Sequence, residues 1–255
     1  TGIVKDCQNF GNVKAMTYAS GICGGSQSGK SVATYSYLIE HCTNKGNLST
    51  TNGVGSAGIA GSYSGAVKDC TNYGITDDTH GTSKSRQYTA GIVACASYAV
   101  DIDGCKNYGA VNGVKNVGGI VGNVMKGDGA ATVIKNCVND AAVNGQDAYV
   151  AGIVANSARA EGVVSVANCT NNGEVTTTAT TDFIGNLRGN STIALGEGNI
   201  IAAGLKTYKL DPETSTAIKG IEQNNAVVKN GKYLKNGRIV IINNGNQYNI
   251  NGTRL

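Results

Sequence analysis

The sequence predicts an all-β fold: a right-handed parallel β-helix, or β-solenoid, of about six rungs, followed by a small antiparallel β meander. Three observations predict it. A Cys-x-Asn motif recurs six times along the chain. Glycine is abundant, with 37 residues in 255, whereas helix-favouring residues are scarce and β-branched residues are common. The apolar segments are only three to six residues long, which suits short strands better than helices.

The cysteines define the length of the repeat. Successive copies are 35, 28, 35, 32 and 32 residues apart. A β-branched residue stands three positions before each Cys, and a Gly stands two positions after each Asn except at Ala141. The six motifs are Cys7/Asn9, Cys42/Asn44, Cys70/Asn72, Cys105/Asn107, Cys137/Asn139 and Cys169/Asn171.

A second block, small–Gly–Ile, lies between successive cysteines, and its clear copies begin at Ser20, Ala57, Ala90, Gly118 and Ala151. A single rung cannot bury its apolar side chains, but stacked rungs can, with each strand pairing in parallel with its counterpart. The shortest repeat, 28 residues, suits three short strands and three corners. Parallel crossovers are nearly always right-handed, which predicts the handedness.

Side-chain parity predicts which repeat positions face the interior. The Cys, the Asn, the Gly and the residue six beyond the Cys share one parity and should point inward. The β-branched residue three before the Cys has the other parity, so the chain should turn between them. The residue just before the Cys is Asp, Asn or Gly in five of six copies, and these tolerate a left-handed corner. We expect a second corner near the Asn-x-Gly step, and a ladder of inward Asn side chains at about 4.8 Å per rung.

The chain divides into three regions: a solenoid over residues 1–202, a linker over 203–225 that holds the single proline, Pro212, and a β meander over 226–255. In the last region Asn-Gly pairs, which favour tight hairpin turns, separate short strand-like runs. These pairs begin at residues 230, 236, 244 and 251.

The solenoid sequence resembles a known class of repeat. The segments Gly119–Gly122 (Gly-Ile-Val-Gly) and Asn168–Val175 (Asn-Cys-Thr-Asn-Asn-Gly-Glu-Val) are similar to the GLUG-type repeats of bacterial surface proteins. The resemblance covers about residues 1–200. It implies a cell-surface location and an adhesion role, and it offers no catalytic motif to carry over.

The C-terminal region resembles something else. Residues 229–252 are similar to the short C-terminal tails of many secreted Bacteroidetes proteins, which in turn resemble sorting signals of type IX secretion. That likeness implies export, with the protein secreted or held on the exterior of the outer membrane.

Eight cysteines in an exported protein raise the question of disulfides. Six of them occupy equivalent positions, so their side chains should point the same way and form a ladder of buried free thiols. Cys23 and Cys95 lie outside this register and are not expected to pair. A metal site would need Cys-x-x-Cys spacing or a nearby His, and His41 should point away from Cys42, so we expect no metal and no cofactor.

Two further patterns hint at enzymatic chemistry. Residues 53–58 match the Gly-x-Gly-x-x-Gly letters of a dinucleotide site, but no helix should follow them. Glycan-cleaving enzymes need paired carboxylates on one face. Asp6 and Asp69 are two rungs apart, and the pairs Asp101/Asp103 and Asp77/Asp78 are more simply an edge and a loop. We therefore expect no enzyme activity and no catalytic residue.

Tyrosines are the best binding candidates. Tyr73 and Tyr108 stand three residues after their cysteines, where parity points them outward from adjacent rungs. A pair that merely stabilises its own sheet face is the alternative. Tyr35, Tyr37 and Tyr88 belong to long insertions, and loops on a rigid scaffold often carry function.

These features predict a secreted or cell-surface binding module of adhesin type that presents loops from a rigid β-rod. The partner would be a glycan or an extracellular protein. A passive stalk and a polysaccharide-degrading β-helix enzyme are the alternatives. Residues 1–202 carry a net charge of −1 and residues 203–255 one of +5, so the solenoid has no basic surface for nucleic acid. No apolar run could span a membrane, and no oligomeric state is predicted.

Overall fold

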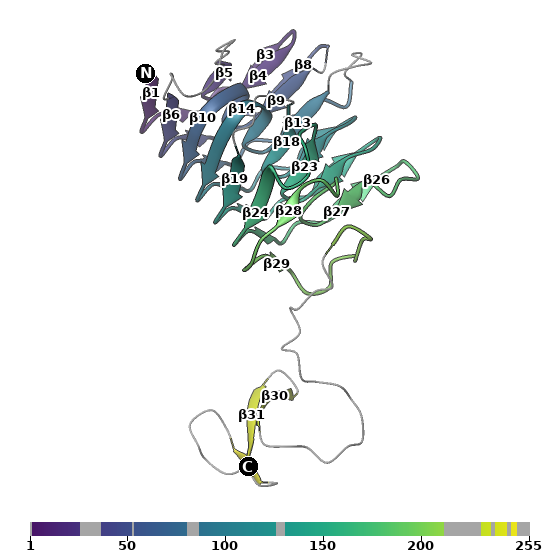
Figure 1. Cartoon of the computed structure of the whole chain (residues 1–255). Coiled ribbons are helices and arrows are strands. Elements are labelled where there is room, and N and C mark those ends of the chain that lie inside the picture. The colour runs from purple at the N-terminus through teal and green to yellow at the C-terminus, as the bar shows by residue number, and fades with distance from the viewer. Residues whose placement is uncertain are drawn as a thin grey trace. The chain divides into compact units, whose positions relative to one another are not determined.

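The computed structural model describes residues 2–25, 37–52, 54–80, 87–125, 131–211, 231–235, 238–243 and 246–248. The chain forms two compact units, Thr1–Pro212 and Glu213–Leu255 (Figure 1). The described residues contain strands and no helix, so none of them forms a helix that could cross a membrane.

The first unit is a β-solenoid of parallel strands (Figure 1). Five turns of the solenoid lie between its six Cys-x-Asn strands. We number its rungs 1 to 6 by these cysteines. The predicted all-β parallel solenoid is confirmed. Each turn, however, contributes to four sheets, here named A to D, rather than to the three strands expected. The extra strand arises because the chain bends again at the small–Gly–Ile block, which separates sheet D from sheet A.

Sheet A precedes the cysteines. Its ten strands are β1 (Gly2–Lys5), β5 (Cys23–Gly25), β6 (Tyr37–Glu40), β10 (Ala60–Lys68), β14 (Val93–Asp103), β18 (Val121–Val124), β19 (Thr132–Lys135), β23 (Val154–Ser157), β24 (Val164–Ala167) and β28 (Ala194–Leu195). Sheet B holds the motif itself. Its strands are β2 (Gln8–Asn9), β7 (Thr43–Asn44), β11 (Thr71–Asn72), β15 (Lys106–Asn107), β20 (Val138–Asn139), β25 (Thr170–Asn171) and β29 (Ile200–Ile201).

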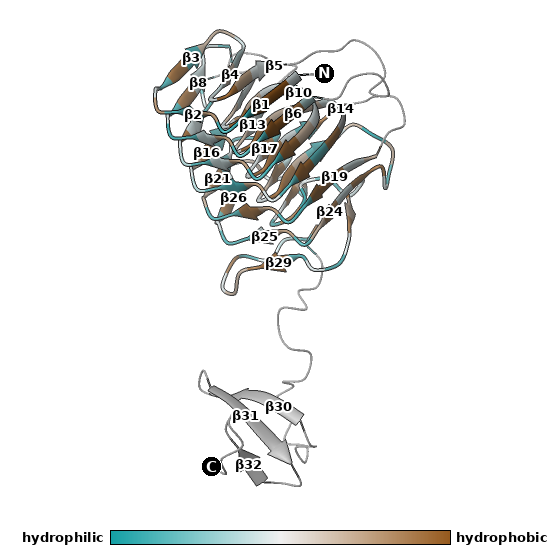
Figure 2. Cartoon of the chain, turned by 90° about the vertical axis from the view of Figure 1, so that its left-hand side faces the viewer, coloured by the Kyte–Doolittle hydropathy of each residue, from teal (hydrophilic) through white to brown (hydrophobic). Residues whose placement is uncertain are grey.

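Sheets C and D complete each turn. Sheet C comprises β3 (Val13–Ala15), β8 (Leu48–Thr50), β12 (Thr76–Asp77), β16 (Val111–Gly113), β21 (Val143–Gly145) and β26 (Val175–Thr177). Sheet D comprises β4 (Tyr18–Ser20), β9 (Gly55–Ala57), β13 (Tyr88–Ala90), β17 (Val117–Gly118), β22 (Val150–Ala151) and β27 (Ile184–Gly185). Figure 2 shows apolar strand residues recurring from rung to rung, with hydrophilic corners between them.

The corner before each Cys is confirmed. The residue at that position has a positive φ in all six rungs: Asp6 55°, His41 54°, Asp69 49°, Gly104 67°, Asn136 55° and Asn168 51°. This left-handed step lets the β-branched residue and the Cys both face the core, as Ile39 and Cys42 do. Burial of such residues from all rungs forms one continuous core.

The Asn ladder runs through the middle of that core. Each ladder Nδ2 donates to the Oδ1 of the next rung's Asn, at 2.7 to 2.9 Å from Asn9 through Asn171. Each also donates to the carbonyl two residues on, as Asn44 does to Gly46 at 2.8 Å. The Gly of the small–Gly–Ile block makes room for this amide: a Cβ on Gly58 would lie 2.3 Å from the Asn72 side chain. The ladder is thus satisfied without water.

The thiol ladder is confirmed for the six motif cysteines, which are free thiols. Five of them are buried, and Cys7 of rung 1 is exposed because no rung covers it in the structure. The Cys42 thiol donates weakly to the Glu40 carbonyl at 3.3 Å. Burial raises the pKa of the Cys42 and Cys137 thiols, so the interior favours the neutral form.

The C-terminal end of the solenoid is closed by residues that the sequence assigned to the linker. Asn186 accepts the last ladder hydrogen bond, from Asn171, at 3.1 Å. Asp211 in turn holds Asn186, accepting from its Nδ2 at 2.8 Å, and the Tyr208 hydroxyl donates to the Val175 carbonyl. Residues 203–211 are therefore a cap, which corrects the expected linker boundary. Residues 212–225 lie outside the described residues.

The second unit contains a three-stranded antiparallel sheet, as predicted, formed by β30 (Gly231–Lys235), β31 (Arg238–Asn243) and β32 (Asn246–Tyr248). Lys235 pairs with Arg238, and Asn243 pairs with Asn246. Two residues therefore connect each pair of strands, at the positions of predicted Asn-Gly turns. The turn residues themselves lie outside the described residues.

Candidate functional site

Outward side chains form three columns along the edge where sheet B passes into sheet C. They occupy the third, fifth and seventh positions after each Cys, and we call them the +3, +5 and +7 columns. The +3 column is Phe10, Lys45, Tyr73, Tyr108, Asp140 and Asn172. The +5 column is Asn12, Asn47, Ile75, Ala110, Ala142 and Glu174. The +7 column is Lys14, Ser49, Asp77, Asn112, Asn144 and Thr176, and strand register aligns its members.

Exposed apolar side chains gather on this edge. Phe10 is 68% exposed, Tyr73 52%, Ile75 43% and Tyr108 42%. These four are half of the exposed large hydrophobic side chains in the described part of the chain. A contiguous exposed apolar surface on a soluble protein commonly marks a contact site.

The structure places Tyr73 and Tyr108 as expected, outward and on adjacent rungs. Their ring centroids are 5.0 Å apart and their planes differ by 11°, so the rings are stacked. Stacking along the rod occupies one face of each ring and turns the ring edges outward. A ligand therefore meets ring edges and hydroxyl groups rather than a flat aromatic platform. In rungs 1 and 2 the Lys45 ammonium lies 5.0 Å from the Phe10 ring centroid, a cation–π contact.

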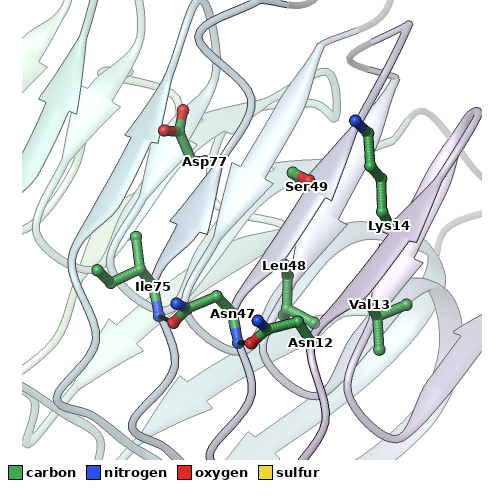
Figure 3. A pocket seen from close by; sticks show the side chains of 8 residues that line it. All are labelled: Asn12, Val13, Lys14, Asn47, Leu48, Ser49, Ile75 and Asp77. Carbon is green, nitrogen blue, oxygen red and sulfur yellow. Dashed lines mark hydrogen bonds between the residues drawn. The ribbon is translucent and has the colours of Figure 1, made fainter.

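Beside these rings a groove runs over rungs 1 to 3, with a volume of about 410 Å³ (Figure 3). Its lining is Asn12, Val13, Lys14, Asn47, Leu48, Ser49, Ile75 and Asp77. The Asn12 Oδ1 accepts from the Asn47 backbone N–H at 2.9 Å, and the Asn47 Oδ1 accepts from the Ile75 N–H at 3.0 Å. Both amides are therefore fixed in orientation by the next rung's backbone.

The charged groups of the groove stand at its two ends. Lys14 and Asp77 both align with Ser49, from opposite sides, so they are two rungs apart, or roughly 10 Å. The Asp77 Oδ1 accepts from the Thr79 hydroxyl at 2.7 Å, and that hydroxyl also contacts the His80 Nδ1 at 2.8 Å. A second hollow, lined by Lys14, Ser49, Thr50, Thr51, Asp77 and His80, shares these groups. The two hollows share Lys14, Ser49 and Asp77.

The carboxylates singled out from the sequence do not converge in the structure. Asp77 faces outward, whereas Asp78 is 3% exposed and faces the core. The Asp78 Oδ1 accepts from the Thr50 backbone N–H at 2.8 Å and from its hydroxyl at 2.9 Å. Burial raises the pKa of the Asp78 carboxyl.

The other acids belong to surface ladders. His41 lies between Asp6 and Asp69 along the corner, with nitrogen–oxygen distances of 3.5 and 3.8 Å. Asp103 contacts Lys135 at 3.4 Å and accepts from the Asn136 amide at 2.7 Å. Exposed ion pairs of this kind contribute little individually to stability, but each of them joins two adjacent rungs.

The remaining tyrosine candidates fare differently. Tyr88 was expected in an exposed loop, but it is 8% exposed in β13 and packs with Ala57, Ala90 and Cys95. That expectation was wrong, because the sheet D strand begins earlier than the insertion suggested. Tyr37 is half-buried in β6 and packs against the main core. Tyr35 lies outside the described residues.

Other sequence motifs acquire structural roles. Within the glycine-rich stretch 53–58, β9 leads through a bend into the strand β10, so no helix follows it; Gly53 lies outside the described residues. The described residues contain no group of three or more His, Cys, Asp or Glu side chains suited to a metal ion. Cys23 is a half-buried thiol in β5, and burial raises its pKa.

The groove was not predicted from the sequence. Most of its residues belong to the outward +5 and +7 positions, which vary from rung to rung and show no repeated motif. Reading the +5 and +7 positions as columns would have placed Asn12, Asn47 and Lys14 side by side. No pattern in the sequence indicates how deep the groove is.

Comparisons with known proteins bear on the fold. No protein-family model and no curated protein matches the chain. Among solved structures, the chain is similar to the crystal structure of a "putative immunoglobulin A1 protease" from Bacteroides ovatus, with a TM-score of 0.60 and 17% sequence identity. The match covers 84% of this chain and 64% of that protein, so the chain spans less than two thirds of its length. At this identity the likeness concerns the β-helix-like fold alone.

Proposed function

We propose that this protein is a secreted or surface-exposed binding module of adhesin type, which contacts an extracellular glycan through the edge between sheets B and C. One observation carries the proposal: exposed aromatic and apolar side chains concentrate on that edge, beside a groove with fixed polar groups. Binding sites commonly combine apolar surface with a few oriented polar groups in a concave place. The resemblance to GLUG-type surface repeats supports the extracellular assignment.

A binding role without catalysis is part of the proposal. It is supported by the separation of Asp77 from Asp78, which lie on opposite sides of the sheet. The described contacts of His41 and His80 are to carboxylates and to a hydroxyl rather than to a cysteine. The protease activity named for the Bacteroides ovatus protein is therefore not extended to this chain.

The alternative is a passive stalk. One observation favours it: the Tyr73 and Tyr108 rings stack on each other and so stabilise their own sheet edge. A stalk would need no ligand, and its outer columns would serve only to hold adjacent rungs together.

A glycan array separates the two functions. We expect the wild-type chain to bind a defined subset of glycans, and the Tyr73→Ala/Tyr108→Ala variant to bind them at least tenfold more weakly. Phe183→Ala is the matched control, since Phe183 is 44% exposed but lies in rung 6, before β27. Absence of binding to every glycan would contradict the proposed function and favour the stalk.

A further inference from the structure

We propose that the groove over rungs 1 to 3 takes an acidic saccharide, whose carboxylate is held by the Lys14 ammonium at one edge while its hydroxyl oxygens accept from the side-chain amides of Asn12 and Asn47 at the other (Figure 3). This inference rests on the proposed function and names the class of glycan.

The Asn12 and Asn47 amides can offer a ligand hydrogen bonds in one direction only. In both Asn12 and Asn47 the Oδ1 is occupied by a backbone N–H of the next rung. What remains for a ligand is the Nδ2 group, a double donor without acceptor capacity. Figure 3 shows the two amides repeating side by side along the lower edge of the groove. A ligand that fits this row must bring acceptor oxygens.

The charges of the groove favour an anionic ligand at its rung 1 end. Lys14 is exposed, and none of the ion pairs among the described residues involves it. Its ammonium is therefore available to an anion, and a carboxylate that accepts from it forms a charge-assisted hydrogen bond. Asp77 stands at the far end of the groove and repels a second anion there. The ligand's acidic group is thus directed to rungs 1 and 2.

The groove also has an apolar flank. Ile75 is 43% exposed at the rung 3 side of the groove, and Leu48 forms part of its lining. The outward residue two positions before Ile75 is Tyr73, which is 52% exposed. The C–H face of a sugar ring can pack against Ile75 while its carboxylate reaches Lys14. The volume of about 410 Å³ lies in the range of small-molecule sites.

The same columns beyond rung 3 lack this arrangement, which makes the site local. Ala110 and Ala142 replace the two Asn residues of the +5 column. In the +7 column the Asn144 amide donates to the Asn112 Oδ1 at 2.9 Å, and the Thr176 hydroxyl donates to the Asn144 Oδ1 at 2.7 Å. Those polar groups are paired with one another.

The test compares two forms of one ligand by calorimetric titration of the full chain. The methyl glycoside of galacturonic acid and its methyl ester differ by one negative charge but share the sugar ring. We expect the acid form to bind at least tenfold more tightly, with affinity that falls as salt is raised. Lys14→Ala should lower its affinity about tenfold, whereas Lys106→Ala, an exposed lysine on the outer face of sheet B, should change it less than twofold.

The outcomes separate this inference from the proposed function. Equal binding of acid and ester, or acid binding insensitive to Lys14→Ala, overturns the acidic-saccharide site while leaving a glycan-binding module in place. Binding of neutral glycans only on the array would likewise overturn the acidic-saccharide site alone. Failure of every saccharide overturns both. Thermal unfolding of each variant checks that the fold is retained, which is expected because both lysines are exposed.

Discussion

Rungs 1 to 3 and rungs 4 to 6 share the same pattern of inward residues but differ in the hydrogen bonds made by their outward side chains. In rungs 4 to 6 the +7 column is a closed chain of side-chain hydrogen bonds, and in the +3 column the Asn172 amide donates to Asp140 at 2.5 Å. In rungs 1 to 3 the +7 column places a lysine, a serine and an aspartate side by side without such bonds among the described contacts. In rungs 1 and 2 the Asn12 and Asn47 amides of the +5 column leave their Nδ2 groups for solvent or a ligand.

The interior shows a parallel difference. Between sheets C and D, rungs 4 to 6 hold an apolar cluster of Val111, Val117, Val143, Val150, Val175 and Ile184. The equivalent region of rungs 2 and 3 contains the buried polar residues Thr50, Ser56, Asp78 and Thr89. The comparison teaches that uniformity is concentrated at the inward Cys and Asn positions and at the β-branched position before the Cys. Other positions are free to specialise, and specialisation concentrates at the N-terminal half.

The largest predicted effect comes from disrupting the inward Asn ladder. Asn107→Ala should lower the free energy of unfolding by about 2–3 kcal/mol, because it removes the buried ladder hydrogen bonds to the Asn72 Nδ2 and to the Asn139 Oδ1. Urea unfolding followed by circular dichroism measures this. Asn112→Ala, which removes one partly buried outer bond, is the control and should cost less than about 0.5 kcal/mol. Equal losses would mean that inner and outer ladders are equivalent.

The second prediction concerns the polar interior of rungs 2 and 3. Asp78→Asn should stabilise the fold at neutral pH by about 1 kcal/mol. It removes a buried charge while its Oδ1 still accepts from Thr50, and its new amide faces the Ser56 hydroxyl. Asp77→Asn, on the outer face, should have little effect.

The pH dependence follows from the sign of the shift at Asp78. Its pKa is raised in the folded state, so the folded protein binds this proton more tightly than the unfolded chain, whose pKa is about 3.9. The wild type should therefore gain stability as the pH falls through the raised pKa toward about 4. The advantage of Asp78→Asn should shrink over the same window. A constant difference between the two proteins from pH 7 to pH 4 would contradict a charged Asp78.

The smallest predicted effect is the coupling of Tyr73 and Tyr108. A double-mutant cycle with alanine should give a coupling of about 0.5 kcal/mol in unfolding free energy, at the low end for aromatic pairs because both rings are exposed. Zero coupling would show that the stacked geometry contributes nothing to stability, and would leave ligand contact as the reason for the pair.

Much of this architecture is readable from the sequence because inward positions repeat. The left-handed corners follow from Asp6, Asp69 and Asn136, which are residues that tolerate positive φ. His41 takes the same φ, and it stacks between Asp6 and Asp69, which share that conformation. The cap was not readable, because Asn186 continues the Asn ladder without its Cys, and Asp211 reaches it from 25 residues away.

The candidate site was readable only in part. Parity placed Tyr73 and Tyr108 outward, but it could not show that their rings stack and turn their edges to solvent. Tyr88 was misplaced because the length of its insertion hides where β13 begins. The groove depends on how Lys14, Asn47 and Ile75 from three rungs lie together, which no single repeat reveals.

The most direct test of the account compares the two halves on the same glycan array. One variant carries Asn12→Ala and Asn47→Ala, which remove the outward donors of rungs 1 and 2. Its matched counterpart carries Asn112→Ala and Asn144→Ala, which remove the paired amides of rungs 4 and 5. The account predicts that binding is lost in the first variant and retained in the second. Binding retained in the first, or lost equally in both, would contradict a ligand site confined to the N-terminal half.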